Sequence, residues 1–120
     1  MKELRTLQNK PEKLQEKTLE KLFILFLNSL PSIYLVKNKS IPFSISYAAL
    51  GNFRITKKDA KHLLREFCKK GWLIPVKFRG FKINIQKALK ILKNSKMGKF
   101  CKDFRIDKER IEKMLEVWKI

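Results

Sequence analysis

The stretch TKKDAKHLLREFCKKG, residues 56–71, carries the clearest helical pattern of the 120-residue chain. Thr56 is a residue type that commonly caps a helix N-terminus, and Gly71 is the type that most often follows a helix C-terminus. At 100° per residue, the apolar positions share one arc about 100° wide. They are Ala60, Leu63, Leu64 and Phe67. The pattern therefore predicts a helix over residues 57–70 with a single buried stripe.

The opposite side of this predicted helix is basic. An arc of similar width holds Lys58, Lys61, His62, Arg65 and Lys69. A basic face opposed to a core face is typical of a helix that contacts a polyanion. The alternative is a basic face that is merely solvated, and for His62 simple exposure is an equally good interpretation.

The residues after Gly71 predict a β-hairpin and then more helix. Residues 72–76 (WLIPV) and 81–85 (FKINI) are apolar and β-branched, and residues 77–80 (KFRG) form a turn that contains a glycine. Residues 86–93 predict a short basic helix, and residues 94–105 a connector. Asp107 caps a final helix. Its apolar stripe consists of Ile111, Met114, Leu115 and Trp118.

The N-terminal part of the chain predicts a helix with a fully buried half. Asn9 and Pro11 are typical of a helix start, and Pro31 stops the helix near Leu30. Its second half, residues 22–27 (LFILFL), is apolar on every side. Such a segment is buried either in a domain core or against a partner chain.

Residues 32–55 predict smaller elements. Residues 32–38 hold a further helical turn, and residues 40–44 (SIPFS) a short edge strand, since proline is confined to strand edges and strand starts. Ser44 and Ser46 are candidate caps for a short helix over residues 45–50. Gly51 and Asn52 end that helix, because both tolerate a left-handed backbone.

The charge of the chain is concentrated in its middle. The formal net charge is +18, from 29 Lys and Arg against 11 Asp and Glu, and residues 32–105 carry +16 of it. Clustered Lys and Arg release counterions from phosphates, which favours a polyanionic partner. The alternative is a Lys-rich composition from an AT-rich genome or a thermophile, but composition bias alone would not leave both ends nearly neutral.

The composition also argues against several classes of protein. The longest apolar run has six residues, too short to span a membrane, and the acidic residues before it are wrong for a signal peptide. Cys68 and Cys101 have only His62 to join them, so we expect no metal site, and we expect no cofactor. A single disulfide stays open if the source is a hyperthermophile. With one histidine and no Gly-rich phosphate loop, we expect no enzymatic activity.

The predicted elements follow the order helix, short strand, helix, tight turn, basic helix, hairpin and further helix. Residues 49–74 (ALGNFRITKKDAKHLLREFCKKGWLI) and the turn Arg79-Gly80-Phe81 are the most telling part of this order. Over residues 14–85, the chain resembles a winged helix-turn-helix domain. Its added terminal helices are similar to those of MarR, PadR and ArsR-like bacterial and archaeal regulators.

This resemblance implies a mainly α fold with a small β-hairpin wing. The winged helix-turn-helix domain would cover residues 1–93, with a connector and an amphipathic helix over residues 94–120. Helix 57–70 would enter the major groove of DNA, and the wing, residues 72–85, would contact the backbone or the minor groove. The DNA-binding residues implied in this way are Asn52, Arg54, Lys57, Lys58, Lys61, His62, Arg65, Lys69, Lys77, Arg79 and Lys82.

Single side chains within that set have different expected roles. Arg65 is the best candidate for a bidentate contact with guanine, while the lysines act as point charges for phosphates. Phe78 at the wing tip is expected either to pack or to touch a sugar or a base. Most other aromatic residues lie at core spacing.

The expected function is duplex DNA binding by a cytoplasmic, nucleoid-associated transcription regulator. A general chromatin, replication or plasmid-partition protein is an alternative, as are a winged-helix protein-interaction module and an RNA-binding protein. We expect a homodimer, formed through the helix from Leu22 to Leu30, through the helix from Ile111 to Trp118, or through both. Such a dimer would present two recognition helices to a palindromic site.

Overall fold

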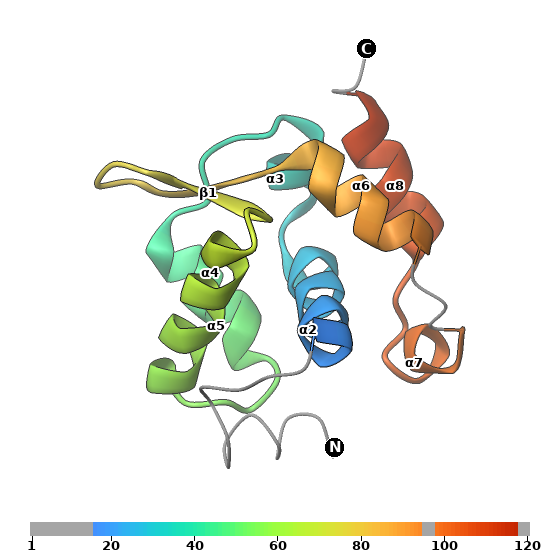
Figure 1. The fold of residues 1–120 in the computed structure, drawn as a ribbon, viewed down its shortest axis with the longest axis horizontal. Helices are drawn as coiled ribbons and strands as arrows, with labels where there is room; N and C mark the ends of the chain where they lie inside the picture. The colour runs from blue at the N-terminus through green and yellow to red at the C-terminus, as the bar shows by residue number, and fades with distance from the viewer. Residues whose placement is uncertain (1–15, 95–97, 118–120) are drawn as a thin grey trace.

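The computed structural model describes residues 16–94 and 98–117 (Figure 1). Within these residues the chain forms seven helices and one two-stranded antiparallel sheet. A mainly helical fold with a small hairpin is therefore confirmed. Helix α2 (Glu16–Ser29) lies in the middle, with α4, α5 and the hairpin on one side and α6, α7 and α8 on the other (Figure 1). The predicted helix start at Asn9 and Pro11 lies outside the described residues.

Helix α2 supplies the centre of the core. All six residues from Leu22 to Leu27 are at most 4% exposed. Phe23 and Phe26 pack against the ring of Phe67, at centroid distances of 5.1 and 5.8 Å. The sequence left open whether these side chains are buried in the core or against a partner chain. The structure shows them buried in the core of the same chain.

The C-terminal helix packs on the same body. Helix α8 (Lys108–Glu116) lies against α3 (Ser32–Val36) and α6 (Ile85–Asn94), and Ile111 and Leu115 are fully buried. Asp107 caps it as predicted, its carboxylate accepting a hydrogen bond of 3.0 Å from the Arg110 N–H. The predicted stripe residue Trp118 lies outside the described residues. The sequence placed a boundary between residues 93 and 94, and buried residues from both sides of it share one core.

Helix α4 (Phe43–Gly51) corrects two predictions. It begins at Phe43, with Pro42 at the N-cap position, so neither Ser44 nor Ser46 is a cap. Pro42 has a φ of −61°, an angle suited to a helix start, and no side-chain hydrogen bond caps α4. The Ser46 hydroxyl donates instead to the Pro42 carbonyl at 3.2 Å. After α4 the left-handed residue is Arg54, at φ +59°, rather than Gly51 or Asn52.

Helix α5 (Lys57–Lys69) and the hairpin follow the prediction closely. Strands β1 (Leu73–Val76) and β2 (Gly80–Ile83) pair antiparallel, with Leu73 opposite Ile83 and Val76 opposite Gly80. The predicted edge strand is reduced to one residue, Ile41, which bridges to Phe81 through two backbone hydrogen bonds.

Helix α7 (Gly98–Asp103) lies where the sequence predicts only a connector. Its C-terminal end is closed by the N–H groups of Arg105 and Ile106, which donate to the carbonyls of Lys102 and Cys101. Arg105 takes the left-handed position at φ +55°, where glycine usually gives the signal. In the described part of the chain no helix is long and apolar enough to cross a bilayer.

Candidate nucleic-acid interface

Both ends of α5 are fixed by hydrogen bonds. Thr56 Oγ1 accepts from the Asp59 N–H at 3.1 Å. At the other end, the Gly71 and Trp72 N–H groups donate to the carbonyls of Cys68 and Phe67, with Gly71 left-handed at φ +76°. This is the Schellman arrangement that terminates many helices. The beginning and the end of α5 are therefore both set by local hydrogen bonds.

A lysine from α6 extends this C-terminal cap. The Lys87 ammonium donates to the Lys70 carbonyl at 3.2 Å. Cations are favourable at the C-terminal end of a helix, where the carbonyl dipoles point outwards. Asn84, just before α6, in turn accepts from the Lys87 N–H at 3.3 Å. Helix α6 thus helps to hold α5 in place.

The two faces of α5 differ as the sequence predicts. Ala60, Leu63, Leu64 and Phe67 are buried. Four cations of the predicted basic face are exposed, Lys58, Lys61, Arg65 and Lys69, and so is Lys57 at the first position of the helix. These side chains lie at the solvent side of a rigid helix, where a polyanion can reach them.

His62 and Lys69 both lie beside the Glu66 carboxylate, but only His62 is partly buried, since the Lys69 side chain remains 73% exposed. The His62 side chain is only 24% exposed, and its Nε2 atom lies 4.0 Å from Glu66 Oε1. Lys69 Nζ lies 3.6 Å from the same carboxylate oxygen. Glu66 therefore offsets part of the positive charge near the C-terminal half of α5, as Asp59 does near its N-terminal end.

The turn before α5 presents Asn52 and Arg54 to solvent. Phe53 between them is buried, at 5% exposure, and anchors the turn in the core. The Phe53 and Arg54 N–H groups donate to the carbonyls of Leu50 and Gly51, both at 3.0 Å. The turn is tight, and it places Arg54 close in sequence to the N-terminus of α5.

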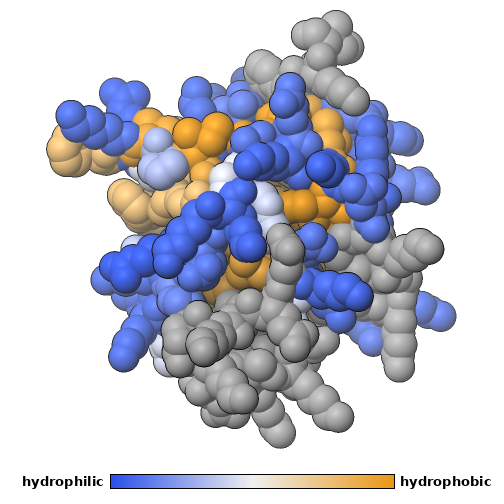
Figure 2. Space-filling model, viewed as in Figure 1, coloured by the Kyte–Doolittle hydropathy of each residue, from blue (hydrophilic) through white to orange (hydrophobic). Residues whose placement is uncertain are grey.

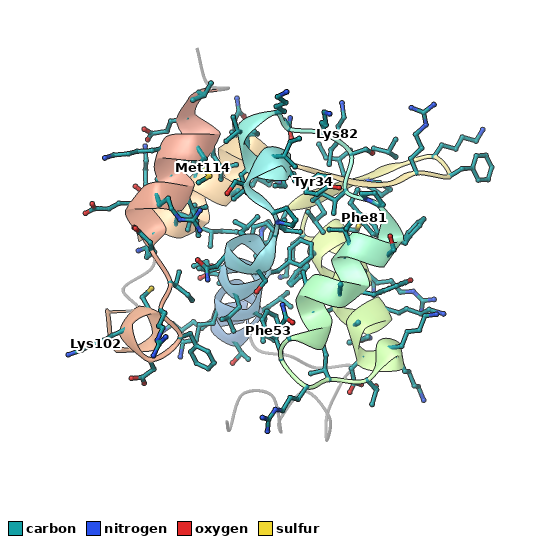
Figure 3. All side chains as sticks on the ribbon, turned by 180° about the vertical axis from the view of Figure 1, so that it is seen from behind. Tyr34, Phe53, Phe81, Lys82, Lys102 and Met114 are labelled. Carbon is teal, nitrogen blue, oxygen red and sulfur yellow. The ribbon has the colours of Figure 1, made fainter. Side chains whose placement is uncertain are left out.

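The hairpin has two unlike faces. Lys77, Arg79 and Lys82 are all exposed. Lys82 and Phe81 are neighbours on β2, and Figure 3 shows Phe81 on the side of α4 and Lys82 on the other side. The structure thus brings only part of the predicted site together, because Lys82 points away from the groove beside α5.

A groove of about 520 Å³ separates the hairpin from α4 and α5. Its lining combines apolar side chains with three cations of α5: Phe43, Tyr47, Leu64, Cys68, Pro75 and Phe81, with Lys61, Arg65 and Lys69. The Phe43 ring packs edge-on against Phe81 at 5.3 Å and remains 43% exposed. Burial raises the pKa of the Cys68 thiol, which therefore stays protonated at neutral pH.

A second, basic cleft of about 540 Å³ lies between the segment from Lys37 to Ser40 and the hairpin. It is lined by Lys37, Asn38, Lys39, Ser40, Val76, Arg79 and Lys82. The sequence did not predict Lys37 and Lys39 in this cleft, or Phe43 and Tyr47 in the groove. The only available signal was the net charge of +3 in residues 32–55.

Comparisons with known proteins add no assignment to this geometry. The chain matches no protein-family model, no curated protein and no solved structure. In the described ranges, no group of three or more His, Cys, Asp or Glu is placed to hold a metal ion. The features that bear on function are therefore the exposed cations of α5, the turn before it, the hairpin and the groove between them.

Proposed function

We propose that this protein binds duplex DNA through α5 and the hairpin, as a winged helix-turn-helix domain that regulates transcription. The observation that carries the proposal is the opposition of two faces on one helix. The inner face of α5 is buried, while Lys57, Lys58, Lys61 and Arg65 are exposed on the outer face. An exposed basic face on a rigidly held helix is the electrostatic footprint of a DNA-binding element.

The arrangement around α5 supports the winged-helix assignment. Helix α4, a tight turn and α5 precede the hairpin in the chain. The bridge between Ile41 and Phe81 adds a third extended segment at the β2 edge. Helix α5 and the hairpin lie along the same side of the molecule (Figure 1). This order and placement are typical of a recognition helix followed by a wing.

The proposed contacts follow from the chemistry of the side chains. The exposed face of α5 from Lys57 to Arg65 enters the major groove, where base edges are distinguishable. Arg65 offers a planar fork that matches the two acceptors of guanine. Lys57, Lys58 and Lys61 neutralise phosphates, and Arg54 holds the backbone near the start of α5. In this proposal the hairpin cations contact the adjacent backbone or minor groove.

One feature favours a second candidate function, a protein-interaction module. The groove beside α5 has an apolar floor, and Phe43 is 43% exposed there. A duplex presents little apolar surface to such a floor, whereas an acidic amphipathic peptide would match both the floor and the cationic rim. This alternative predicts no salt-dependent binding to DNA. A general chromatin, replication or plasmid-partition role, by contrast, predicts DNA binding without sequence preference.

Fluorescence anisotropy with a random-sequence duplex across a salt series tests the proposal. We expect a log-log slope of about −4 to −6, from five to seven phosphates neutralised at about −0.9 each. Unlabelled RNA should compete less well than unlabelled duplex DNA. A flat salt response would contradict DNA binding and favour the interaction module. Equal affinity for every duplex in a sequence-selection experiment would favour the general DNA-binding alternative over regulation.

We propose a homodimer as the assembly that presents two α5 helices to a palindromic site. Residues 22–27 of α2 are buried within one chain and are not available for a dimer contact, whereas Val117 at the end of α8 remains 58% exposed. Ile33 and Val36 on α3, which packs on α8, remain 42% and 40% exposed. Sedimentation equilibrium measures the assembly directly, and a monomer at all concentrations, with and without DNA, would contradict it.

A further inference from the structure

Phe78 is placed where the folded chain gains little from it. Its side chain is 91% exposed, against 40–58% for the other exposed large hydrophobic side chains in the described part of the chain. Its one recorded ring contact is with the Lys77 ammonium, which lies 5.7 Å from the ring centroid. Phe78 thus contributes no packing to the core, so its position needs another explanation.

The backbone at Phe78 is also unfavourable for phenylalanine. Its φ is +62°, in the left-handed region where glycine and asparagine are favoured and a bulky residue is an outlier. The Arg79 N–H donates to the Val76 carbonyl at 3.0 Å, so Phe78 is the third residue of a tight turn. Strain of this kind persists mainly at sites that serve a function.

The surroundings of the ring indicate its partner. Lys77 and Arg79 flank Phe78, so the hairpin tip is an apolar ring between two cations. The hairpin projects from the body on the same side as α5 (Figure 1), and Figure 2 shows hydrophilic side chains beside the hydrophobic tip, with further hydrophobic surface between the tip and the body. Proteins that kink DNA insert such apolar wedges between base steps, with cations on the backbone. A membrane surface needs a broader apolar face than one ring.

We propose that Phe78 is a wedge that enters the base stack of the bound duplex and kinks it. This inference rests on the proposed function and adds a consequence that DNA binding alone does not require. Lys77 and Arg79 hold the two backbones, and Phe78 partly unstacks the base step between them. The protein then unwinds and bends the DNA that it binds.

The change in plasmid linking number tests the wedge without knowledge of a target sequence. A closed circular plasmid is relaxed by a topoisomerase with increasing amounts of bound protein, and anisotropy on a random duplex is measured in parallel. Phe78→Asn removes the ring, keeps both cations and suits the left-handed backbone. Phe78→Leu keeps an apolar wedge. Circular dichroism melting verifies that both variants fold, and Phe78→Asn should melt no lower than the wild type.

We expect wild type and Phe78→Leu to change the linking number, whereas Phe78→Asn retains its salt slope but loses about two thirds or more of the change per bound chain. Wild-type binding with no change in linking number would overturn the wedge and leave the proposed function intact. A full change with Phe78→Asn would do the same. Absence of any duplex binding would overturn the proposed function, and the wedge with it. Binding to anionic vesicles is measured for the same proteins. If Phe78→Asn loses vesicle binding but keeps the full change in linking number, the wedge is overturned in favour of a membrane contact.

Discussion

At the scale of single residues, Gly80 is the described glycine whose surroundings leave least room for a side chain. A Cβ atom there would lie 1.9 Å from the Ile41 carbonyl oxygen, which belongs to the backbone and cannot move aside cheaply. The φ of Gly80 is +136°, a conformation that L side chains rarely adopt. Gly80 therefore permits the bridge between residue 41 and β2, and with it the position of the hairpin.

Replacement of Gly80 by alanine tests this reading. We expect Gly80→Ala to lower the free energy of unfolding by about 2–3 kcal/mol, since it combines backbone strain with a steric clash. Gly51→Ala is the matched control, because a Cβ at Gly51 would meet nothing within 4 Å. That variant should be as stable as the wild type or more stable by about 0.5–1 kcal/mol. Urea denaturation followed by circular dichroism measures both, and equal stabilities would refute the argument.

Left-handed residues mark the limit of sequence reasoning at this scale. Arg54, Phe78 and Arg105 all have positive φ, yet none has a residue type that signals it. Gly71 does have such a type, and the end of α5 was predicted correctly. Where tertiary contacts impose the left-handed conformation on an ordinary residue, the local sequence carries no trace of it.

At the scale of elements, the N-terminal cap of α5 is the interaction most directly tied to the proposed interface. Thr56→Ala removes the hydroxyl that accepts from the Asp59 N–H, and we expect a loss of about 1 kcal/mol in unfolding free energy. Ser44→Ala is the control. Ser44 was predicted as a cap but lies inside α4, so its replacement should change stability by less than about 0.5 kcal/mol. Equal losses in the two variants would contradict the observed caps.

The two cysteines can report which elements are covered in the proposed complex with DNA. Cys68 lies in the groove beside Arg65, whereas Cys101 lies on α7. Burial raises the pKa of both thiols, so alkylation by iodoacetamide needs a higher pH than an ordinary free thiol. We expect duplex DNA to slow the alkylation of Cys68 severalfold and to leave Cys101 unchanged, as read by mass spectrometry. Protection of Cys101 alone would place the DNA on α7 and would contradict the proposed contact with α5.

The elements of the interface differ in how far the sequence predicts them. Helix α5 has capping residues, an apolar stripe and a basic face within 16 consecutive residues, so local rules suffice. Local rules cannot predict the groove, because Phe43 comes from α4 and Pro75 and Phe81 come from the hairpin. Only tertiary packing brings them together. The basic cleft escapes prediction for the same reason, since Lys37 is far from Arg79 in the sequence.

At the scale of the whole molecule, the C-terminal helix α8 packs on the same hydrophobic core as α5. Ile111 of α8 is fully buried, and α8 packs against α3 and α6. We expect Ile111→Ala to lower the free energy of unfolding by about 2–5 kcal/mol in a single transition. The folded fraction should keep the wild-type salt slope for DNA, because α5 is untouched. Two separate transitions would show instead that α8 folds independently of the rest.

The central claim is that duplex DNA lies on the outer face of α5, and a charge-matched comparison tests it most directly. The double variant Lys61→Ala with Arg65→Ala and the control Arg110→Ala with Lys113→Ala each remove one arginine and one lysine. Both pairs are exposed, but the control pair lies on α8, at the opposite side of the molecule (Figure 1).

Anisotropy with a random-sequence duplex across a salt series compares the two variants at equal net charge. We predict that the α5 variant binds about tenfold or more weakly than the wild type, with a log-log slope shallower by about 1 to 2. The α8 variant should remain close to the wild type in both quantities. Equal losses of affinity and slope in the two variants would contradict the account, since DNA would then respond to the net charge of the protein and not to α5.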